Sequence, residues 1–271
     1  MMVNTRSFPI LRCKKNQCLN TQDMVVREIG LRIVLSDSQG EENFAFIRTI
    51  PHEPEALVLG LLFTSRIISV PSDVLQMTVR NQLAKVRLDD RCNVHEKVMA
   101  LRPTSRLVTG VCGPEESAIG VWQACDLLPV ETSFTISPTI IHSAVKRLNS
   151  EMKIYRETGG THGAALIAQN GNMLFLAEDV GRHNAVDRVI GKGFEESIDL
   201  ASTLIVCSGR LTSDLVLKVA VARLSMIASI SAAVDSGIEL AEAAGITLIG
   251  FVRGARMNVY THPNRLAILT G

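Results

Sequence analysis

Aromatic residues are scarce in this chain of 271 residues, at 4%, whereas hydrophobic residues make up 46%. The core is therefore expected to be aliphatic, and the length fits one large domain or two smaller ones. A net charge of +1 argues against a general nucleic-acid binder or membrane-surface binder. The sequence also lacks a cleavable signal pattern and any apolar run of the roughly 18 residues that a membrane helix needs. We therefore expect a cytoplasmic protein with no nucleic-acid partner and no membrane partner.

No Cys-x-x-Cys pair occurs among the six cysteines, which are Cys13, Cys18, Cys92, Cys112, Cys125 and Cys207. This absence excludes a zinc knuckle and a thioredoxin-type motif. In a reducing compartment most of these thiols are expected to be free. Residues 1–22 are polar, basic and aperiodic, and we interpret them as a flexible tail in which Cys13 and Cys18 are incidental.

Two parts of different pattern follow this tail. Residues 23–135 predict a small N-terminal α+β domain, with strand alternation over 29–35 and 74–88 and a helix that starts near Pro54. Residues 136–271 alternate strands and helices, beginning with a helix capped by Ser137. A hairpin signal at 171–172 interrupts the alternation. The fold class is therefore predicted to be α/β, with a three-layer α/β sandwich and a mixed sheet in the second part.

The stretch 174–191 passes from a buried strand pattern to a helical pattern through a group of ionisable side chains. That group consists of Glu178, Asp179, Arg182 and His183, followed by Asn184. Backbone N–H groups at a helix start attract anions, so this turn is typical of a ligand site. The alternative interpretation is an ordinary acidic loop before a capped helix.

Polar segments recur where strands of the second part are expected to end, and open α/β sheets place their ligands at such ends. These segments are residues 157–162, 178–184, 208–213 and 253–256, and the polar residues 260–263 follow them. Arginines on glycine-rich turns suit a phosphate or pyrophosphate ligand. For His162 and His183 taken singly, a purely structural role is the alternative.

One cysteine stands in a glycine-rich loop. Within residues 107–114, Cys112 lies between Val111 and Gly113, and glycine lets the backbone bend and leaves the sulfur unshielded. Basic neighbours such as Arg102 and Arg106 favour a reactive thiolate if they lie close. The loop therefore predicts a sulfur carrier or a nucleophile, with a buried, inert thiol as the alternative.

Three segments together resemble the FdhD/NarQ family of formate dehydrogenase accessory proteins. They are residues 158–166 (TGGTHGAAL), 178–187 (EDVGRHNAVD) and 259–263 (VYTHP). The resemblance covers nearly the whole chain after about residue 23. It implies a second domain similar in fold to cytidine deaminases, and a homodimer.

The resemblance also implies an activity. Members of the family act as sulfurtransferases that take persulfide sulfur from a cysteine desulfurase. They pass it to a molybdenum or tungsten bis(pterin guanine dinucleotide) cofactor, which then enters formate dehydrogenase. The segment that contacts the cofactor corresponds here to Phe251, Val252, Arg253, Gly254, Ala255 and Arg256.

This sequence departs from the family pattern at the sulfur loop. The family usually has Cys-Gly-x-Cys-Gly, and here the first cysteine is replaced by Thr109, whose hydroxyl cannot form a persulfide. Transfer through the single thiol of Cys112 is one interpretation, since attack and release need only one sulfur at a time. A cofactor-binding maturation chaperone without sulfur transfer is the other.

The preferred hypothesis assigns roles to residues. Cys112 carries the persulfide, and His162 and His183 orient or protonate the pterin–metal end. The cofactor's phosphates are bound by Arg182, Arg210, Arg253 and Arg256. A zinc deaminase is disfavoured, because residues 183–185 and 208–213 lack the catalytic acid and the thiolate ligands of those enzymes. No zinc is expected.

Overall fold

The computed structural model describes residues 4–101 and 128–267. Its strands form three sheets, which follow one another along the chain. The strands are β1 (Thr5–Lys14), β2 (Gln17–Val26), β3 (Ile29–Ser36), β4 (Glu41–Thr49), β5 (Val74–Arg80), β6 (Leu83–Leu88), β7 (His162–Ala168), β8 (Met173–Asp179), β9 (Thr203–Cys207), β10 (Met226–Ser229), β11 (Thr247–Arg253) and β12 (Arg256–Val259). The α-helices are α1 (Pro54–Thr64), α2 (Val94–Leu101), α5 (Pro138–Glu151), α6 (Lys153–Thr158), α7 (Arg182–Glu195), α8 (Ser213–Val221) and α9 (Asp235–Ala243).

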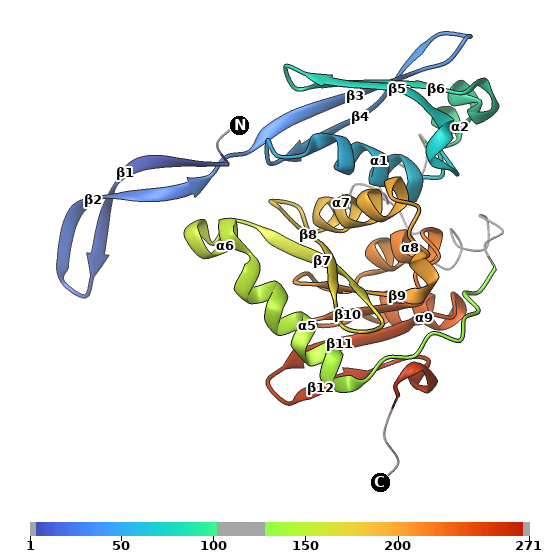
Figure 1. Cartoon of the computed structure of the whole chain (residues 1–271). Coiled ribbons are helices and arrows are strands. Elements are labelled where there is room, and N and C mark those ends of the chain that lie inside the picture. The colour runs from blue at the N-terminus through green and yellow to red at the C-terminus, as the bar shows by residue number, and fades with distance from the viewer. Residues whose placement is uncertain (1–3, 102–127, 268–271) are drawn as a thin grey trace.

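The largest sheet has the order β12-β11-β10-β9-β7-β8 and is mixed. Strands β9, β10 and β11 are parallel, whereas β7, β8 and β12 each run antiparallel to a neighbour. Helix α5 packs an aliphatic face against one side of this sheet, and α7, α8 and α9 cover the other side (Figure 1). The α/β class predicted from the sequence is confirmed. The closer likeness to cytidine deaminases stays a prediction.

A smaller sheet of order β4-β3-β6-β5 packs on α1, and its alternating residues Leu31, Ile33 and Leu35 are buried against that helix. Helix α1 in turn lies on α7, so the two sheets are joined through a pair of helices (Figure 1). The predicted boundaries at 23–135 and 136–271 stay predictions, because residues 102–127 lie outside the described part of the chain.

Glycines allow α1 and α7 to approach each other at backbone distance. A Cβ atom on Gly191 of α7 would lie 2.0 Å from the carbonyl oxygen of Ala56 in α1, and one on Gly60 would lie 1.8 Å from that of Asp187. Real atoms do not come this close, so any larger residue at these positions must push the helices apart.

Gly191→Ala is therefore expected to lower the free energy of unfolding by about 1–3 kcal/mol, the usual cost of overpacking. Gly193→Ala in the same helix is the matched control, because its Cβ would meet only side-chain atoms of Leu200 and Leu166. Urea unfolding of the two variants measures the difference. Equal stabilities would show that the close crossing of the helices is not maintained in solution.

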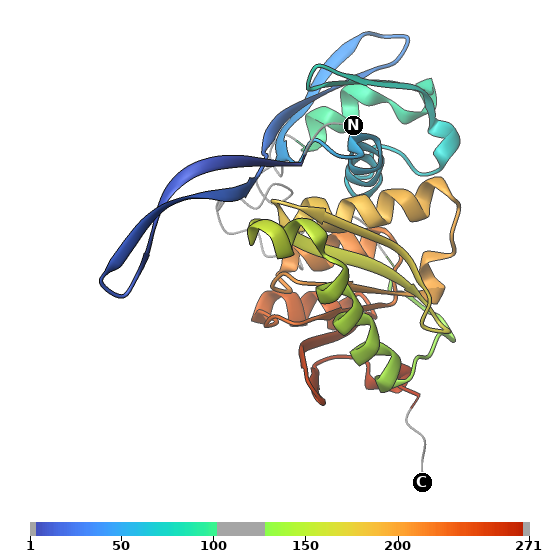
Figure 2. The ribbon, with the colours of Figure 1, turned by 60° about the vertical axis from the view of Figure 1, so that its left-hand side comes forward.

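The N-terminal segment differs from the sequence-based expectation. Residues 1–22 were expected to be a flexible tail, but β1 and β2 form a long antiparallel hairpin, here called the arm, that projects from the body in both views (Figures 1 and 2). A two-residue turn at Lys15 and Asn16 places Cys13 opposite Cys18, and a disulfide joins them. These two cysteines are therefore paired rather than incidental.

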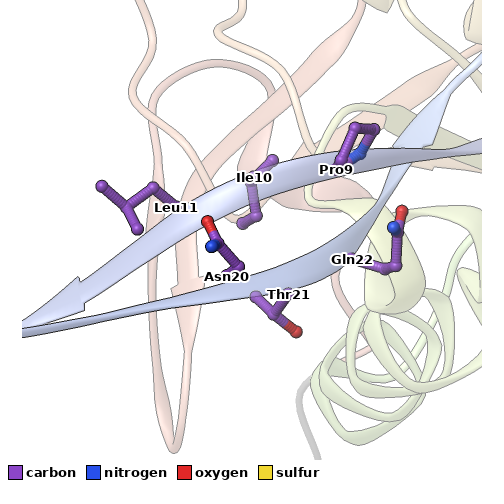
Figure 3. Close-up of a pocket in the computed structure, with 6 residues that line it drawn as sticks. All are labelled: Pro9, Ile10, Leu11, Asn20, Thr21 and Gln22. Atoms are coloured by element: carbon purple, nitrogen blue, oxygen red, sulfur yellow. The ribbon is translucent and has the colours of Figure 1, made fainter.

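The arm also contains a proline inside a strand. The bond from the Arg27 N–H to the Asn4 carbonyl and the register of the hairpin place the nitrogen of Pro9 on the side away from β2. Proline is tolerated there because no partner strand needs its missing N–H. A hollow of about 640 Å³ lies along the arm and is lined by Pro9, Ile10, Leu11, Asn20, Thr21 and Gln22 (Figure 3). All six residues belong to the arm.

Candidate functional site

One edge of the six-stranded sheet collects most of the polar segments that the sequence singled out. The parallel strands β9, β10 and β11 end there, and the antiparallel neighbours place the start of β7 and the end of β8 at the same edge. Helix α6 and the base of the arm lie on this side (Figure 1). We call it the strand-end edge.

The starts of α7 and α8 bring together a cluster of charged side chains at this edge. The Nε2 atom of His183 lies 2.8 Å from Oδ2 of Asp214, and Nη2 of Arg182 lies 4.0 Å from the same oxygen. Asp214 also accepts hydrogen bonds from the Thr212 hydroxyl and from the Leu215 N–H. Burial alone would raise the pKa of Asp214. The hydrogen bonds from His183 and Thr212 and the positive charges of His183 and Arg182 have the larger effect, so this pKa lies well below its usual value.

Arg182 has spare hydrogen-bonding capacity. Its Nε atom is buried and has no hydrogen-bond partner in the described part of the chain. Gly209 provides the space for its side chain, because a Cβ there would lie 2.9 Å from Cβ of Arg182. A partly buried guanidinium with a free donor fits an anionic oxygen of a ligand.

His162 lies beside this cluster at the start of β7. Its Nδ1 atom is 3.1 Å from the Ser208 hydroxyl, which also accepts a bond from the Gly163 N–H. Burial, and then the charges of Arg182 and His183, lower the pKa of His162. His162 is therefore a neutral imidazole at neutral pH, able both to donate and to accept a hydrogen bond.

The predicted segment from Phe251 to Arg256 divides between core and surface. Val252 is buried, whereas Arg253 and Arg256 are exposed at the turn between β11 and β12. The Arg253 Nε atom donates to the Ile230 carbonyl at 2.8 Å, and its guanidinium lies over the Phe251 ring. This bond ties the turn to the end of β10, so Arg253 belongs to the strand-end edge.

Three other residues that were predicted to bind the cofactor lie at the surface. Gly254 and Ala255 are exposed, and Gly254 has a φ of +57°, which glycine adopts without strain. Arg210 is exposed in the loop between β9 and α8. The backbone of Arg256 pairs with Arg253 in the β11–β12 ladder, but in the described part of the chain the guanidinium groups of Arg210 and Arg256 make no hydrogen bond or ion pair. Both groups are therefore available to a ligand.

The acidic residues of the stretch 174–191 have structural roles. The Glu178 carboxylate accepts bonds from the Ile154 and Tyr155 N–H groups at 2.9 and 2.7 Å, and so caps α6. Asp179 is fully buried and pairs with Arg188. The alternative of an ordinary acidic loop therefore holds for these two residues, and the ligand-site interpretation is left to Arg182 and His183.

Residues 260–263, which follow the four polar strand ends in the sequence, do not reach the strand-end edge. Strand β12 runs antiparallel to β11 and returns the chain to the opposite end of the sheet. There the His262 carbonyl accepts a bond from the Thr247 hydroxyl, and the Leu248 N–H donates to the Thr261 hydroxyl. This segment closes the sheet rather than contributing to the site.

Of the two free cysteines in the described part of the chain, Cys207 lies beside the cluster. It ends β9, directly before Ser208, and is buried. Burial raises its pKa to about 11, so at neutral pH it is a protonated thiol and a poor nucleophile. Burial likewise raises the pKa of Cys92. Thr109 and Cys112 lie outside the described residues.

Sequence reasoning missed Asp214. It lies in the first turn of α8, where acidic residues are common, and it meets His183 only because the start of α7 lies beside the start of α8. Across residues 4–101 and 128–267, no group of three or more His, Cys, Asp and Glu side chains lies close enough to hold a metal ion. No helix in these ranges is long and apolar enough to cross a membrane.

The titration of His162 tests the geometry of the cluster. Its pKa is expected below the ordinary value of about 6.5, and Arg182→Ala is expected to raise it, because a neighbouring positive charge is removed. In the wild type, the pKa of His162 is lower in the folded chain than in the unfolded chain, so the unfolded chain binds a proton that the folded chain does not. His162 should therefore make the protein less stable as pH falls below about 6.5. NMR titration of the imidazole measures the shift, and Arg147→Ala on α5 is the control. An unchanged pKa in Arg182→Ala would contradict the arrangement.

The fold and the edge together define an α/β protein with a cationic sheet edge suited to an anionic ligand. The model of the FdhD/NarQ family matches residues 26–267, and the chain belongs to this family. The resemblance noted from the sequence motifs is thereby confirmed.

Curated relatives match over almost the full length. The sulfur carrier protein FdhD of Saccharolobus solfataricus is 32% identical over 268 residues, which cover 98% of this chain and 100% of the relative. The protein of the same name from Bacillus subtilis is 30% identical over 258 residues, or 95% of each chain. A crystal structure from Desulfotalea psychrophila, described as that of a formate dehydrogenase accessory protein, has the same fold. Its TM-score is 0.75 at 22% identity, with 97% of this chain and 100% of that chain covered.

Proposed function

We propose that this protein is a sulfur carrier. It takes persulfide sulfur from a cysteine desulfurase and passes it to a molybdenum or tungsten bis(pterin guanine dinucleotide) cofactor destined for formate dehydrogenase. The proposal includes a homodimer that works in the cytoplasm. Two curated relatives of nearly the same length, both called sulfur carrier protein FdhD, support it.

The observation that carries the proposal is the set of cationic groups at the strand-end edge. Within the described residues, Arg182 keeps a free donor beside Gly209, and the guanidinium of Arg256 has no partner. Arg256 lies with the partly engaged Arg253 at the turn from β11 to β12. The start of α7 adds N–H groups to the same edge. Guanidinium groups bind phosphate oxygens through paired N–H donors. Guanidinium groups along this edge therefore suit the phosphates of a guanine dinucleotide.

The two histidines supply different hydrogen-bonding properties. Because Nδ1 of neutral His162 is engaged by the Ser208 hydroxyl, its Nε2 atom offers a single hydrogen bond to a heterocycle such as a pterin. His183 is fixed by Asp214 at 2.8 Å, and so presents its ring in one orientation. Both rings stand beside Arg182, so a ligand whose phosphates contact that arginine would extend past them.

The sulfur step requires one thiolate. The Cys112 thiolate attacks the terminal sulfur of the donor's persulfide, a new S–S bond forms on Cys112, and the donor cysteine leaves as a thiolate. Thr109 cannot take part, since it has no sulfur. Cys207 and Cys92 are unsuited to this attack, because both are buried and their pKa values are raised.

Binding of guanosine diphosphate tests the cofactor site without sulfur chemistry, because this molecule carries the guanine and pyrophosphate of the proposed substrate. Arg182→Ala and Arg256→Ala are each expected to weaken binding roughly 10- to 100-fold, the effect of losing a hydrogen bond to a charged group. Arg147→Ala removes an arginine that pairs with Glu151 on α5, and should leave affinity unchanged. Calorimetry measures all three. Equal affinity in Arg182→Ala, Arg256→Ala and the wild type would remove the strand-end edge from the binding site.

A further inference from the structure

The tip of the arm exposes a pair of cysteines that the proposed function does not use. Cys13 and Cys18 lie opposite each other in the hairpin, are joined by a disulfide, and are both exposed. The arm contacts the body at its base, where Val26 of β2 packs against Gly160 after α6. In both views the tip points away from the body, so another molecule can reach the disulfide (Figures 1 and 2).

The surroundings of the disulfide are positively charged. Lys14 and Lys15 adjoin Cys13 at the turn, and neither makes an ion pair with any residue in the described part of the chain. Arg12, on the other side of Cys13, pairs with Asp23 at 2.7 Å. An anionic attacker such as a thiolate is therefore drawn to the tip rather than repelled from it.

The four cysteines in the described ranges thus fall into two kinds. Cys92 and Cys207 are buried, with raised pKa values, and are protected from reagents in solution. Cys13 and Cys18 are exposed, and exposed disulfides exchange with thiols more readily than shielded ones. Among the residues that the structure describes, β1 and β2 pair only with each other, and α6 contacts the arm at its base. An isolated two-stranded hairpin is at best marginally stable. The disulfide therefore also controls how well the tip is ordered.

We propose that Cys13 and Cys18 form a thiol–disulfide exchange site that reacts with thiols and switches the arm between a closed and a loosened state. In the first step a thiolate attacks one cysteine sulfur, a mixed disulfide forms, and the other cysteine leaves as a thiolate. A second thiolate then attacks the donor sulfur and releases the first cysteine. In sum, two thiols become one disulfide, and two electrons and two protons pass to the cysteines. The donor is a small monothiol or a protein dithiol, and the reaction does not depend on the proposed sulfur transfer.

A redox titration tests the exchange site directly. The full-length protein is equilibrated at set ratios of reduced to oxidised glutathione, alkylated, and mapped by peptide mass. We expect Cys13 and Cys18 to pass together from disulfide to dithiol within the range of ratios, with loss of hydrogen-exchange protection in the arm. In a second series, reduced thioredoxin replaces glutathione, and faster opening at equal thiol concentration would identify a protein dithiol as the donor. A pair that never forms a disulfide, or one that stays closed at every ratio with both donors, would overturn the proposal.

Variants separate exchange from simple exposure. Cys13→Ser leaves Cys18 without its resolving partner, so this variant should accumulate a stable mixed disulfide with glutathione. Lys14→Glu should slow opening by glutathione roughly three- to tenfold at low salt, because the tip then repels the anionic thiolate. Lys146→Glu makes the same charge change on the exposed side of α5 and should leave the rate unaltered. Equal rates for Lys14→Glu and Lys146→Glu would show that the tip has no role in attracting its reactant.

Discussion

Replacing Asp179 by alanine is expected to lower the free energy of unfolding by about 3–5 kcal/mol, because it leaves the buried charge of Arg188 without its partner. Asp179 is 0% exposed and Arg188 is 2% exposed, and two guanidinium nitrogens lie 2.9 and 3.0 Å from Oδ2 of the carboxylate. The Thr49 hydroxyl, at the end of β4, donates to the same oxygen at 2.6 Å. This network therefore joins the smaller sheet to the strand-end edge.

The same substitution should also weaken the site. Asn184 and the Gly181 N–H both donate to the other oxygen of Asp179, and these bonds fix the turn that precedes Arg182. Urea unfolding gives the loss of stability as a shift in midpoint at unchanged slope. Glu151→Ala is the matched control, since Glu151 also pairs with an arginine, but at the surface. Its expected cost is about 0.5 kcal/mol or less. Similar costs for the two variants would show that the Asp179 network is not intact in solution.

Replacing Cys112 by alanine is expected to abolish sulfur transfer. No other residue of the loop 107–114 has a thiol, and the buried Cys92 and Cys207 cannot substitute for it. The measurement is formate dehydrogenase activity in a strain that lacks its own accessory protein and receives the variant. Cys92→Ala, which removes a buried thiol outside the loop, should restore activity like the wild type.

The same strain distinguishes a sulfur carrier from a cofactor-binding chaperone. Normal dehydrogenase activity with Cys112→Ala would mean that the thiol is unnecessary, and would favour the chaperone. Thr109→Cys restores the usual family pair, and should at least match the wild type if one thiolate already suffices. The proposed function places guanosine diphosphate at the strand-end edge and not at the loop, so Cys112→Ala should bind this nucleotide normally. That result would separate failure of the sulfur step from failure of the cofactor site.

The elements that the sequence predicted well are those with a burial pattern. Alternating apolar residues over 29–35 became β3, and the signal at Gly171 became the tight connection of β7 to β8. Burial of an alternating or continuous apolar run is a local property, so the sequence records it directly. The arm has no such pattern of buried apolar residues. Its strands are exposed and held together by cross-strand hydrogen bonds and one disulfide, which a polar, aperiodic sequence does not reveal.

The candidate site was predicted in outline and corrected in its details. Strand ends and arginines were recognised because both are visible locally. The partners of Asp179 and His183 were not, since Thr49 is 130 residues from Asp179, and Asp214 joins His183 only when α7 and α8 pack side by side. The direction of one short strand, β12, decided that residues 260–263 lie at the opposite end of the sheet. Sequence patterns indicate which residues can serve a ligand, and tertiary pairing decides which of them come together.

The central claim is that the thiol of Cys112 accepts sulfur in this protein. The most direct measurement is peptide mass analysis after incubation with a cysteine desulfurase and cysteine, followed by alkylation under non-reducing conditions. We predict that the peptide containing Cys112 gains the mass of one sulfur atom, and that the peptides containing Cys92 and Cys207 do not. Desulfurase turnover with no added sulfur on Cys112 would contradict the proposed function.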